Sequence, residues 1–429
     1  MQRCIKLALI LLYLVSVPEV KSQTVYSIKS DTLNINLDSI EHVFLRKNLL
    51  LLAQRYNIEA QKALVVQAKL FPNPGLNVGT TFYQSDTKQF FPSGKNNELS
   101  VGLSQVILLA GKHNKQLKVA QTNATLSEYQ FYDLLRTLKH TLRTDFFSIH
   151  FLLQSAGVYN SEIAALQKVS DAFALQKGKG YISEKEVIRV KAQLYSIQNE
   201  YNDLKTQLND VQSELRLLLQ TGNVYIIPEV DDAALEKLNP GKYPLAAIID
   251  SAYATRPDLK IAQLTTDLSK QNYNLQKALA VPDLTVQLGY DQQGSYIKNL
   301  TTLGFGIDLP FFNRNQGNIK SAKAMIKYNQ ATYDAMRTDV DEQIFNTLKK
   351  AIDNDQLLKS RDASFESDFS RIQAEMLKNY QLRNIGLLEF LDFYDSYKQN
   401  TLQVNAIKFN RVSAFEDLNY YSNIDYLKN

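Results

Sequence analysis

Several residue types are scarce in this chain of 429 residues, and each scarcity excludes a class of protein. The only cysteine is Cys4, which excludes a disulfide framework, a thiolate metal site and a cysteine-based enzyme in the rest of the chain. Lys and Arg total 48 against 44 Asp and Glu, so the strong basic excess of a nucleic-acid binder is missing. Hydrophobic residues make up 45%, which excludes wholesale disorder.

The N-terminus has the layout of a secretion signal. Arg3 and Lys6 precede an apolar run over 7–17, and Val20 and Ser22 then occupy the −3 and −1 positions of a predicted cleavage site. The apolar run is too short for a transmembrane helix, which needs roughly 20 residues. We therefore expect cleavage after Ser22 and export of the mature chain.

The positions of Gly and Pro, which break helices, divide the chain into two similar halves. In the first half, the run 112–177 holds one Gly and no Pro, and the shorter run 181–220 holds neither. The second half repeats this order with 318–385 and 387–420, which contain no Gly or Pro. A helix of about 66 residues reaches on the order of 100 Å, several times the diameter of a domain. The sequence therefore predicts two long helical hairpins.

The shorter runs carry heptads, which predict paired helices. Apolar residues alternate spacings of three and four from Val187 to Leu218. The same register returns 203 positions later, from Phe390 to Leu418, with Arg411 as one of two polar exceptions. Two hairpins of matching dimensions indicate an internal duplication.

Each long run is preceded by a predicted β-hairpin, at about 75–108 and about 283–310. In both, bulky apolar residues alternate with small or polar ones, over strands of about the 9–11 residues that cross a bilayer in a tilted barrel. A soluble sheet with one buried face alternates in the same way. Because the second face is small and polar, and little else remains for the sheet to pack on, we favour a water-filled lumen. The expected lumen residues are Asn77, Gly79, Thr81, Ser100, Gly102, Gln287, Gly289, Gly304, Gly306 and Asp308.

Four strands cannot close a barrel around a lumen, and lipid does not tolerate open sheet edges. Several chains must therefore share one barrel. Three chains would supply twelve strands, although the residues alone do not choose three over two or four. Aromatic residues near the strands, such as Phe82, Phe91, Phe311 and Phe312, fit interfacial girdles. Ordinary core positions are an equal alternative for any single one of them.

The layout resembles the TolC-like outer-membrane efflux channel family over nearly the whole mature chain. The matching segments are 68–79 and 99–112 in the first half, and 279–290 and 303–319 in the second. Each segment is a loose pattern, so their duplicated order carries the likeness. The resemblance implies a homotrimer, an outer-membrane barrel in lipid, and two partners, a periplasmic adaptor protein and an inner-membrane efflux pump.

The predicted fold is mainly α with a small β part. Under the resemblance, long coiled-coil hairpins form a periplasmic α-barrel, and four transmembrane strands per chain contribute to a shared trimeric barrel of twelve strands. The segment 222–244 contains three prolines and breaks both patterns, so we expect equatorial structure there. The predicted organisation is a signal peptide over 1–22, a first repeat over 23–221, an equatorial linker over 222–244 and a second repeat over 245–429.

In the family, the hairpin tips close the periplasmic entrance and receive the adaptor. The first tip fits the family pattern, whereas in the second Arg383 replaces the glycine and Gly386 replaces Ser183 of the first, which leaves the turn geometry open. The expected adaptor-contact residues are Gly180, Tyr181, Ile182, Ser183, Arg383, Asn384, Ile385 and Gly386, and the expected entrance acids are Glu186, Glu389 and Asp392. A ring of such carboxylates from three chains would favour cations. Solvated surface acids are the alternative.

No constellation for catalysis or for metal binding is visible. His140 and His150 lie ten residues apart, on roughly opposite faces of a helix, and no phosphate loop or nucleophile motif occurs. We therefore expect no enzyme, no metal site and no cofactor. The predicted function is a passive outer-membrane exit channel of a tripartite efflux pump, for small molecules or ions. The alternatives are a duct for one-step protein secretion and a soluble periplasmic coiled-coil scaffold.

Overall fold

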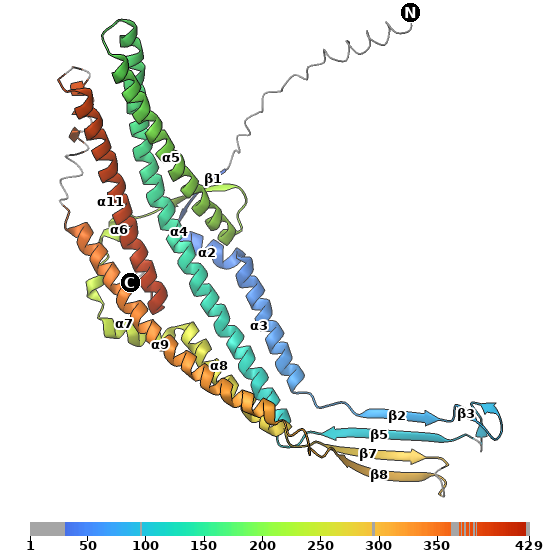
Figure 1. Cartoon of the computed structure of the whole chain (residues 1–429). Helices are drawn as coiled ribbons and strands as arrows, with labels where there is room; N and C mark the ends of the chain where they lie inside the picture. The colour runs from blue at the N-terminus through green and yellow to red at the C-terminus, as the bar shows by residue number, and fades with distance from the viewer. Residues whose placement is uncertain are drawn as a thin grey trace, which may run out of the picture.

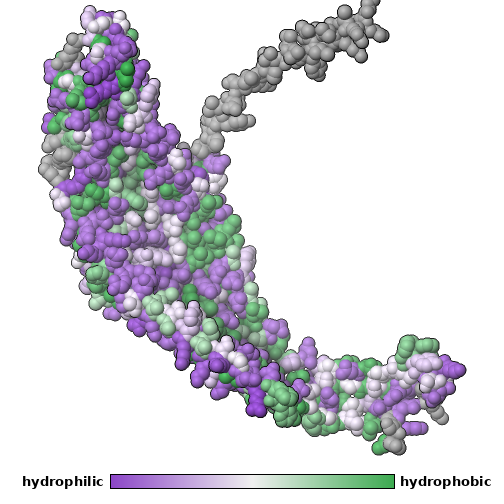
Figure 2. All heavy atoms as spheres, viewed as in Figure 1, coloured by the Kyte–Doolittle hydropathy of each residue, from purple (hydrophilic) through white to green (hydrophobic). Residues whose placement is uncertain are grey.

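The computed structural model describes residues 31–94, 97–293, 297–361, 369, 371–372, 375–376, 378–380, 382 and 384–425. The predicted signal peptide and Arg383 therefore lie outside the described residues. The chain is elongated, with its longest strands at one end and helices that extend from them in a curved layer (Figure 1). In the view of Figure 2, hydrophilic residues dominate the surface of the helical part, and the strand end shows more apolar and near-neutral surface.

The strands at this end form an antiparallel sheet of four strands and a separate small hairpin. Their bounds are Gly75–Thr80 (β2), Tyr83–Gln84 (β3), Gln89–Phe90 (β4), Leu99–Ile107 (β5), Leu284–Asp291 (β7) and Leu300–Ile307 (β8). The four longer strands are ordered β2-β5-β7-β8, so β5 and β7 join the two predicted hairpins, and β3 and β4 form a small hairpin of their own. Within the described residues, β2 and β8 each pair on one side only and are the edges of the sheet.

Four helices continue from the sheet (Figure 1). They are α3 (Leu49–Ala68), α4 (Lys112–Gly178), α8 (Pro257–Leu279) and α9 (Gln316–Lys359). In the layer, α3 packs on α4, α4 on α8 and α8 on α9, so the helix order follows the strand order from β2 to β8. With 67 residues, α4 is about 100 Å long at 1.5 Å per residue. No Pro interrupts its hydrogen-bond ladder, so it runs unbroken.

Two helices of 36 residues complete the layer away from the sheet: α5 (Glu184–Leu219) and α11 (Leu387–Ser422). The chain turns back from α4 into α5, and α11 packs on both α4 and α9. Heptad residues of α5, such as Val190 and Ile197, share one buried cluster with Phe173 of α4 and Phe390 of α11. The two predicted heptads therefore meet in a common core.

The second long helix differs from the prediction. It was expected to span 318–385, but α9 ends at Lys359 with Ser360 as its C-cap, and the described residues 369, 371–372, 375–376 and 378–380 are again helical. The backbone N–H of Ser360 still donates to Gln356, and the side chain of Arg361 turns to Asn400 of α11 at 3.3 Å. The hydroxyl of a serine competes for backbone hydrogen bonds, which makes Ser a weaker helix former than Ala or Leu, so the helix can end at Ser360 without Gly or Pro. A map of Gly and Pro alone could not find this end.

Short elements form a belt midway along the helices (Figure 1). They are β1 (Asp31–Asn36), α2 (Leu37–Lys47), β6 (Val224–Glu229), α6 (Asp232–Glu236), the 3-10 turn η2 (Pro240–Lys242) and α7 (Leu245–Thr255). β1 and β6 pair in parallel. The buried side chain of Gln212 fixes β6, since its amide bonds both the carbonyl and the N–H of Ile226, at 2.6 and 3.0 Å.

Arg411, a polar exception in the second heptad, is buried where α11 crosses this belt. Its guanidinium donates to Asp355 of α9 at 2.8 Å and to the backbone carbonyls of Leu235 and Leu238. Three elements distant in sequence are therefore tied together by one side chain. The break in the heptad marks this crossing.

Candidate channel wall and entrance

The pairing register separates the sheet into two faces of different chemistry. Directly opposed residues of an antiparallel pair lie on the same face. One row runs from Asn77 through Gly102 and Gly289 to Thr302. Its face consists of Gly75, Asn77, Gly79, Ser100, Gly102, Ser104, Val106, Thr285, Gln287, Gly289, Asp291, Leu300, Thr302, Gly304 and Gly306. Thus the expected lumen residues within strands share one small, mostly polar face, and Thr81 and Asp308 lie just beyond the ends of β2 and β8.

The opposite face of the sheet is apolar and exposed. Leu76, Val78, Leu303 and Phe305 are 67%, 62%, 63% and 68% exposed in the single chain. A soluble sheet covers its apolar face with another layer, whereas these side chains remain uncovered in the chain. An apolar face of this kind, backed by a polar one, fits a sheet whose outside meets lipid and whose inside meets water.

Glycines on the polar face make room for hydroxyl groups on the neighbouring strand. A Cβ atom on Gly79 would lie 2.6 Å from Oγ of Ser100, and one on Gly289 would lie 2.7 Å from Oγ1 of Thr302. By contrast, a Cβ atom on Gly304 meets its nearest neighbour, Cβ of Gln287, at an ordinary 3.8 Å. Some glycines are therefore required by strand packing, and others leave open space on this face.

Aromatic side chains gather at both ends of the strands. In the hairpin loop, Phe82 makes edge contacts with Phe90 and Phe91 at centroid distances of 5.5 and 5.2 Å. At the helix end, Phe311 and Phe312 are 68% and 96% exposed. Aromatic residues at two levels separated by an apolar band fit the girdles of a membrane barrel.

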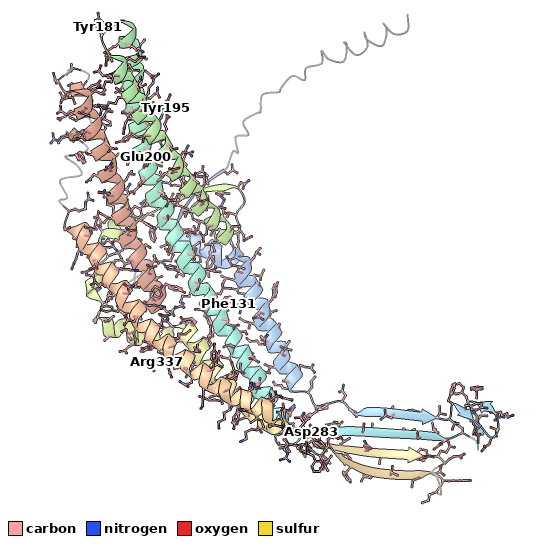
Figure 3. All side chains as sticks on the ribbon, in the orientation of Figure 1. Phe131, Tyr181, Tyr195, Glu200, Asp283 and Arg337 are labelled. Carbon is pink, nitrogen blue, oxygen red and sulfur yellow. The ribbon has the colours of Figure 1, made fainter. Side chains whose placement is uncertain are left out.

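An ion pair fixes the junction between the sheet and the helices. Oδ1 of Asp283 accepts from Nζ of Lys112 at 2.6 Å and from the N–H of Leu109 at 3.0 Å. The Lys112 side chain is only 4% exposed. Figure 3 places Asp283 where the strands meet the helices. Just before α4, Gly111 takes a left-handed conformation with φ of 67°, which turns the chain from strand into helix.

The first hairpin tip is closed by paired caps. The N–H of Tyr181 donates to the carbonyl of Gln176 at 3.1 Å, and the N–H of Gly180, with φ of 76°, donates to Lys177 at 2.9 Å. This is the Schellman arrangement that ends a helix at a left-handed glycine. Tyr181 lies at the extreme end of the molecule (Figure 3). A capping box of Ser183 and Glu186 then begins α5.

The second tip repeats part of this design. The N–H of Asn384 donates to the carbonyl of Asn379 at 2.9 Å, the same offset as in the first tip. Gly386 is the N-cap of α11 and has no side chain to cap it. Ile385 is half-buried between them. The turn closes without the serine cap of the first tip.

The three expected entrance acids are in different situations. Glu389 and Asp392 are exposed on α11, one helical turn apart. The carboxylate of Glu186 accepts from the hydroxyl and the N–H of Ser183, at 2.7 and 3.0 Å. These hydrogen bonds lower the pKa of Glu186, so it stays ionised as a cap. The spacing Ser-x-x-Glu was a visible signal for this cap, whereas nothing in the sequence pointed to the pairing of Lys112 with Asp283.

A family model described as "Outer membrane efflux protein" matches residues 42–221 and 248–371 of this chain. The chain belongs to this outer membrane efflux protein family. Membership assigns an efflux channel of the outer membrane that extends into the periplasm, and the family is a class of channels rather than of enzymes. The localisation and the channel function predicted from the sequence are thus confirmed.

Individual relatives are distant in sequence. The cobalt-zinc-cadmium resistance protein CzcC of Cupriavidus metallidurans is 22% identical over 300 residues, covering 69% of this chain and 68% of that protein. The outer membrane channel CmeC of Campylobacter jejuni superposes with a TM-score of 0.73 at 15% identity, covering 90% of this chain and 85% of that one. For MtrE of Neisseria gonorrhoeae in its open state, the TM-score is 0.67 at 17% identity, with 90% and 88% covered. These likenesses confirm the predicted fold class, mainly α with long helical hairpins and a small β part.

No described helix is both long and apolar enough to cross a membrane. Nor do three or more His, Cys, Asp or Glu side chains within the described ranges cluster as they would around a metal ion.

Proposed function

We propose that three copies of this chain form the passive exit duct of a tripartite efflux pump. The observation that carries the proposal is the four-stranded sheet with one polar face, one exposed apolar face and two open edges, β2 and β8. Lipid does not tolerate open edges, so β8 of one copy pairs with β2 of the next. Twelve strands tilted by about 40° give a barrel roughly 24 Å across, wide enough for a water-filled lumen.

The helical layer supports the same assembly. Its two outer helices, α3 and α9, lie on the sides of β2 and β8, so a neighbour that continues the sheet also lies beside them. On α3, Leu49 and Tyr56 are 56% and 61% exposed, and on α9, Tyr328 and Phe345 are 64% and 52% exposed. Apolar side chains at both free edges favour burial against another copy.

The expected lumen residues line the duct in this proposal, and the hairpin tips form its periplasmic entrance. Glu389 and Asp392, exposed and one turn apart near the start of α11, would place acidic rings at that entrance. The tips over 180–183 and 384–386 would receive the adaptor, and the inner-membrane pump would supply the energy. A channel that conducts must bind its substrate weakly, and the open space at Gly304 fits a lumen without a tight site.

We propose small molecules or ions as the substrates. The name of CzcC states resistance to cobalt, zinc and cadmium, so these cations are the first to test. A strain lacking the chain should accumulate its substrate, whereas a secretion duct would instead leave an exported polypeptide in the periplasm. Comparing metal and dye sensitivity with the secreted proteins separates these two kinds of duct.

The decisive experiment is extraction of the mature protein followed by a native mass measurement and recording in planar bilayers. Release only with detergent, the mass of three copies and ion conductance support the duct. Release without detergent as a water-soluble protein would support the periplasmic scaffold and overturn the proposal.

A further inference from the structure

A buried carboxyl group lies between the two helical hairpins. Glu162 of α4 is fully buried, and neither of its oxygens has a hydrogen-bond partner among the described residues. It lies within the span of α4 that packs between α5 and α11. Burying a carboxylate without a partner is costly, so this side chain stays neutral or finds a cation.

A buried lysine that acts on Glu162 joins the two hairpins. Nζ of Lys398, on α11, lies 2.8 Å from Oε2 of Glu200 on α5 and 3.1 Å from Oδ1 of Asp395. The Lys398 side chain is 5% exposed. The hydroxyl of Tyr159, one turn before Glu162 on α4, also donates to Glu200, at 3.4 Å. Figure 3 shows Glu200 between the tip and the belt. Lys398 therefore links the second hairpin to the first at the level of Glu162.

The charges around Glu162 are unbalanced. The groups that act on it are Lys398 and Asp395 from α11 and Glu200 from α5, with the neutral hydroxyls of Tyr394 and Tyr159 close by. The single ammonium group of Lys398 thus interacts with three carboxyl groups, those of Glu162, Glu200 and Asp395. Burial raises the pKa of Glu162 to about 8, Lys398 opposes this shift, and Asp395 and Glu200 add to it.

We propose that Glu162 and Lys398 are positioning residues of the entrance, and that ionisation of Glu162 loosens the contact between α5 and α11. While Glu162 is protonated, Lys398 forms ion pairs with Glu200 and Asp395 only. Once ionised, Glu162 either draws Lys398 away from Glu200 or reaches water as the helices separate. Both changes weaken the contact between α5 and α11 at the level of Glu162, which lies 18 residues, or roughly 27 Å along α4, from Gly180 at the first tip. This inference rests on the proposed duct.

The direction of the pH effect follows from linkage. When the hairpins are apart and Glu162 is hydrated, its pKa returns toward about 4.3. The joined state therefore binds the proton more tightly than the separated state. The joined state is therefore fully favoured below about pH 4.3, and this preference is progressively lost as the pH rises to about 8. The entrance should accordingly open more readily in alkaline than in acidic solution.

The test records single-channel conductance of the assembled protein as the pH is raised from about 5 to about 9, the range of the titration. The wild type should rise several-fold in open probability, and Glu162→Gln should remain at its low-pH value throughout. Asp145→Asn is the matched control, because burial also raises the pKa of Asp145 on α4 to about 8. Asp145 faces Glu214 of the same hairpin, so this variant should keep the wild-type profile.

A second variant covers the case in which Glu162→Gln does not assemble. Glu200→Gln removes a carboxylate that raises the pKa of Glu162 and also removes the partner of Lys398 on α5. The channel should therefore open more readily at low pH, and its further rise in open probability between about pH 5 and about pH 9 should be smaller than in the wild type. A wild type that shows no pH dependence, a Glu162→Gln channel that keeps it, or a Glu200→Gln channel whose pH-dependent rise is as large as that of the wild type would each overturn the inference. Loss of the trimer or of membrane residence in the wild type would instead refute the proposed duct.

Discussion

Lys112 and Asp283 form an ion pair of 2.6 Å at the junction of sheet and helices, although 171 residues separate them in the sequence. Lys112 begins α4 in the first repeat, and Asp283 immediately precedes β7 in the second. The pair therefore joins the two repeats where the predicted barrel meets the tunnel. It also orders the turn into α4, since Asp283 accepts the N–H of Leu109.

Replacing Asp283 with Asn should destabilise the assembled protein. The change leaves the ammonium of Lys112 buried without its counter-charge, and breaking a buried pair costs about 3 kcal/mol or more. Because Asp283 is 29% exposed, we expect about 2 kcal/mol, measured by denaturant unfolding. Lys270→Gln is the control, since Lys270 and Asp267 are half-exposed and their pair is worth about 0.5 kcal/mol. Equal losses of unfolding free energy in the two variants would mean that the pair of Lys112 and Asp283 stabilises the protein no more than an exposed ion pair.

Arginine substitutions on neighbouring residues of β8 should separate the two faces of the sheet. Gly304→Arg should assemble and lower the single-channel conductance, because its side chain enters the open polar face. Leu303→Arg should fail to assemble in the membrane, since a lipid-facing Arg costs about 2–4 kcal/mol at the bilayer midplane.

Assembly state is read by native mass and conductance by planar bilayer recording. If Gly304→Arg conducts like the wild type, this face does not line a lumen. If Leu303→Arg inserts normally, the apolar face does not meet lipid.

Removing the acids near the start of α11 should reduce the cation preference of the channel. The double variant Glu389→Ala with Asp392→Ala deletes two exposed carboxylates per copy, so a trimer loses six negative charges at its entrance. We expect the reversal potential in a salt gradient to move toward that of a non-selective pore. Glu229→Ala with Asp250→Ala removes the same charge from exposed positions in the belt and should leave selectivity unchanged. An unaltered reversal potential in the first variant would refute the acidic ring.

The first hairpin tip should depend on one glycine. Gly180 has φ of 76°, so Gly180→Ala places a Cβ atom in the left-handed region at a cost of about 1–2 kcal/mol. Tip amides should then exchange with solvent roughly 5–30 times faster in hydrogen-exchange measurements. Gly178→Ala is the control, because Gly178 is helical, a Cβ atom there meets nothing within 4 Å, and Ala favours helix. Equal exchange rates in both variants would show that the left-handed turn is not required.

Much of the wall was predictable from local patterns. Side chains alternate between the two faces of a strand, so the sequence of each strand predicts its polar and its apolar face. The observed register places the polar faces of neighbouring strands side by side, as in the row from Asn77 to Thr302. The heptad from Val187 similarly predicted which side of α5 is buried. The end of α9 at Lys359 could not be predicted from Gly and Pro, because the helix ends at Ser360.

By itself, the sequence determined the length of α4, the two chemistries of the sheet and the duplicated order of the elements. These depend on residues close together in the chain, whose spacing sets which side of a strand or helix they occupy. Only the tertiary structure decided that Lys112 meets Asp283 and that Lys398 meets Glu200 beside the buried Glu162. Such contacts join segments of both repeats. Their strength depends on how deeply the charged groups are buried, and burial results from tertiary packing and not from the local spacing of residues.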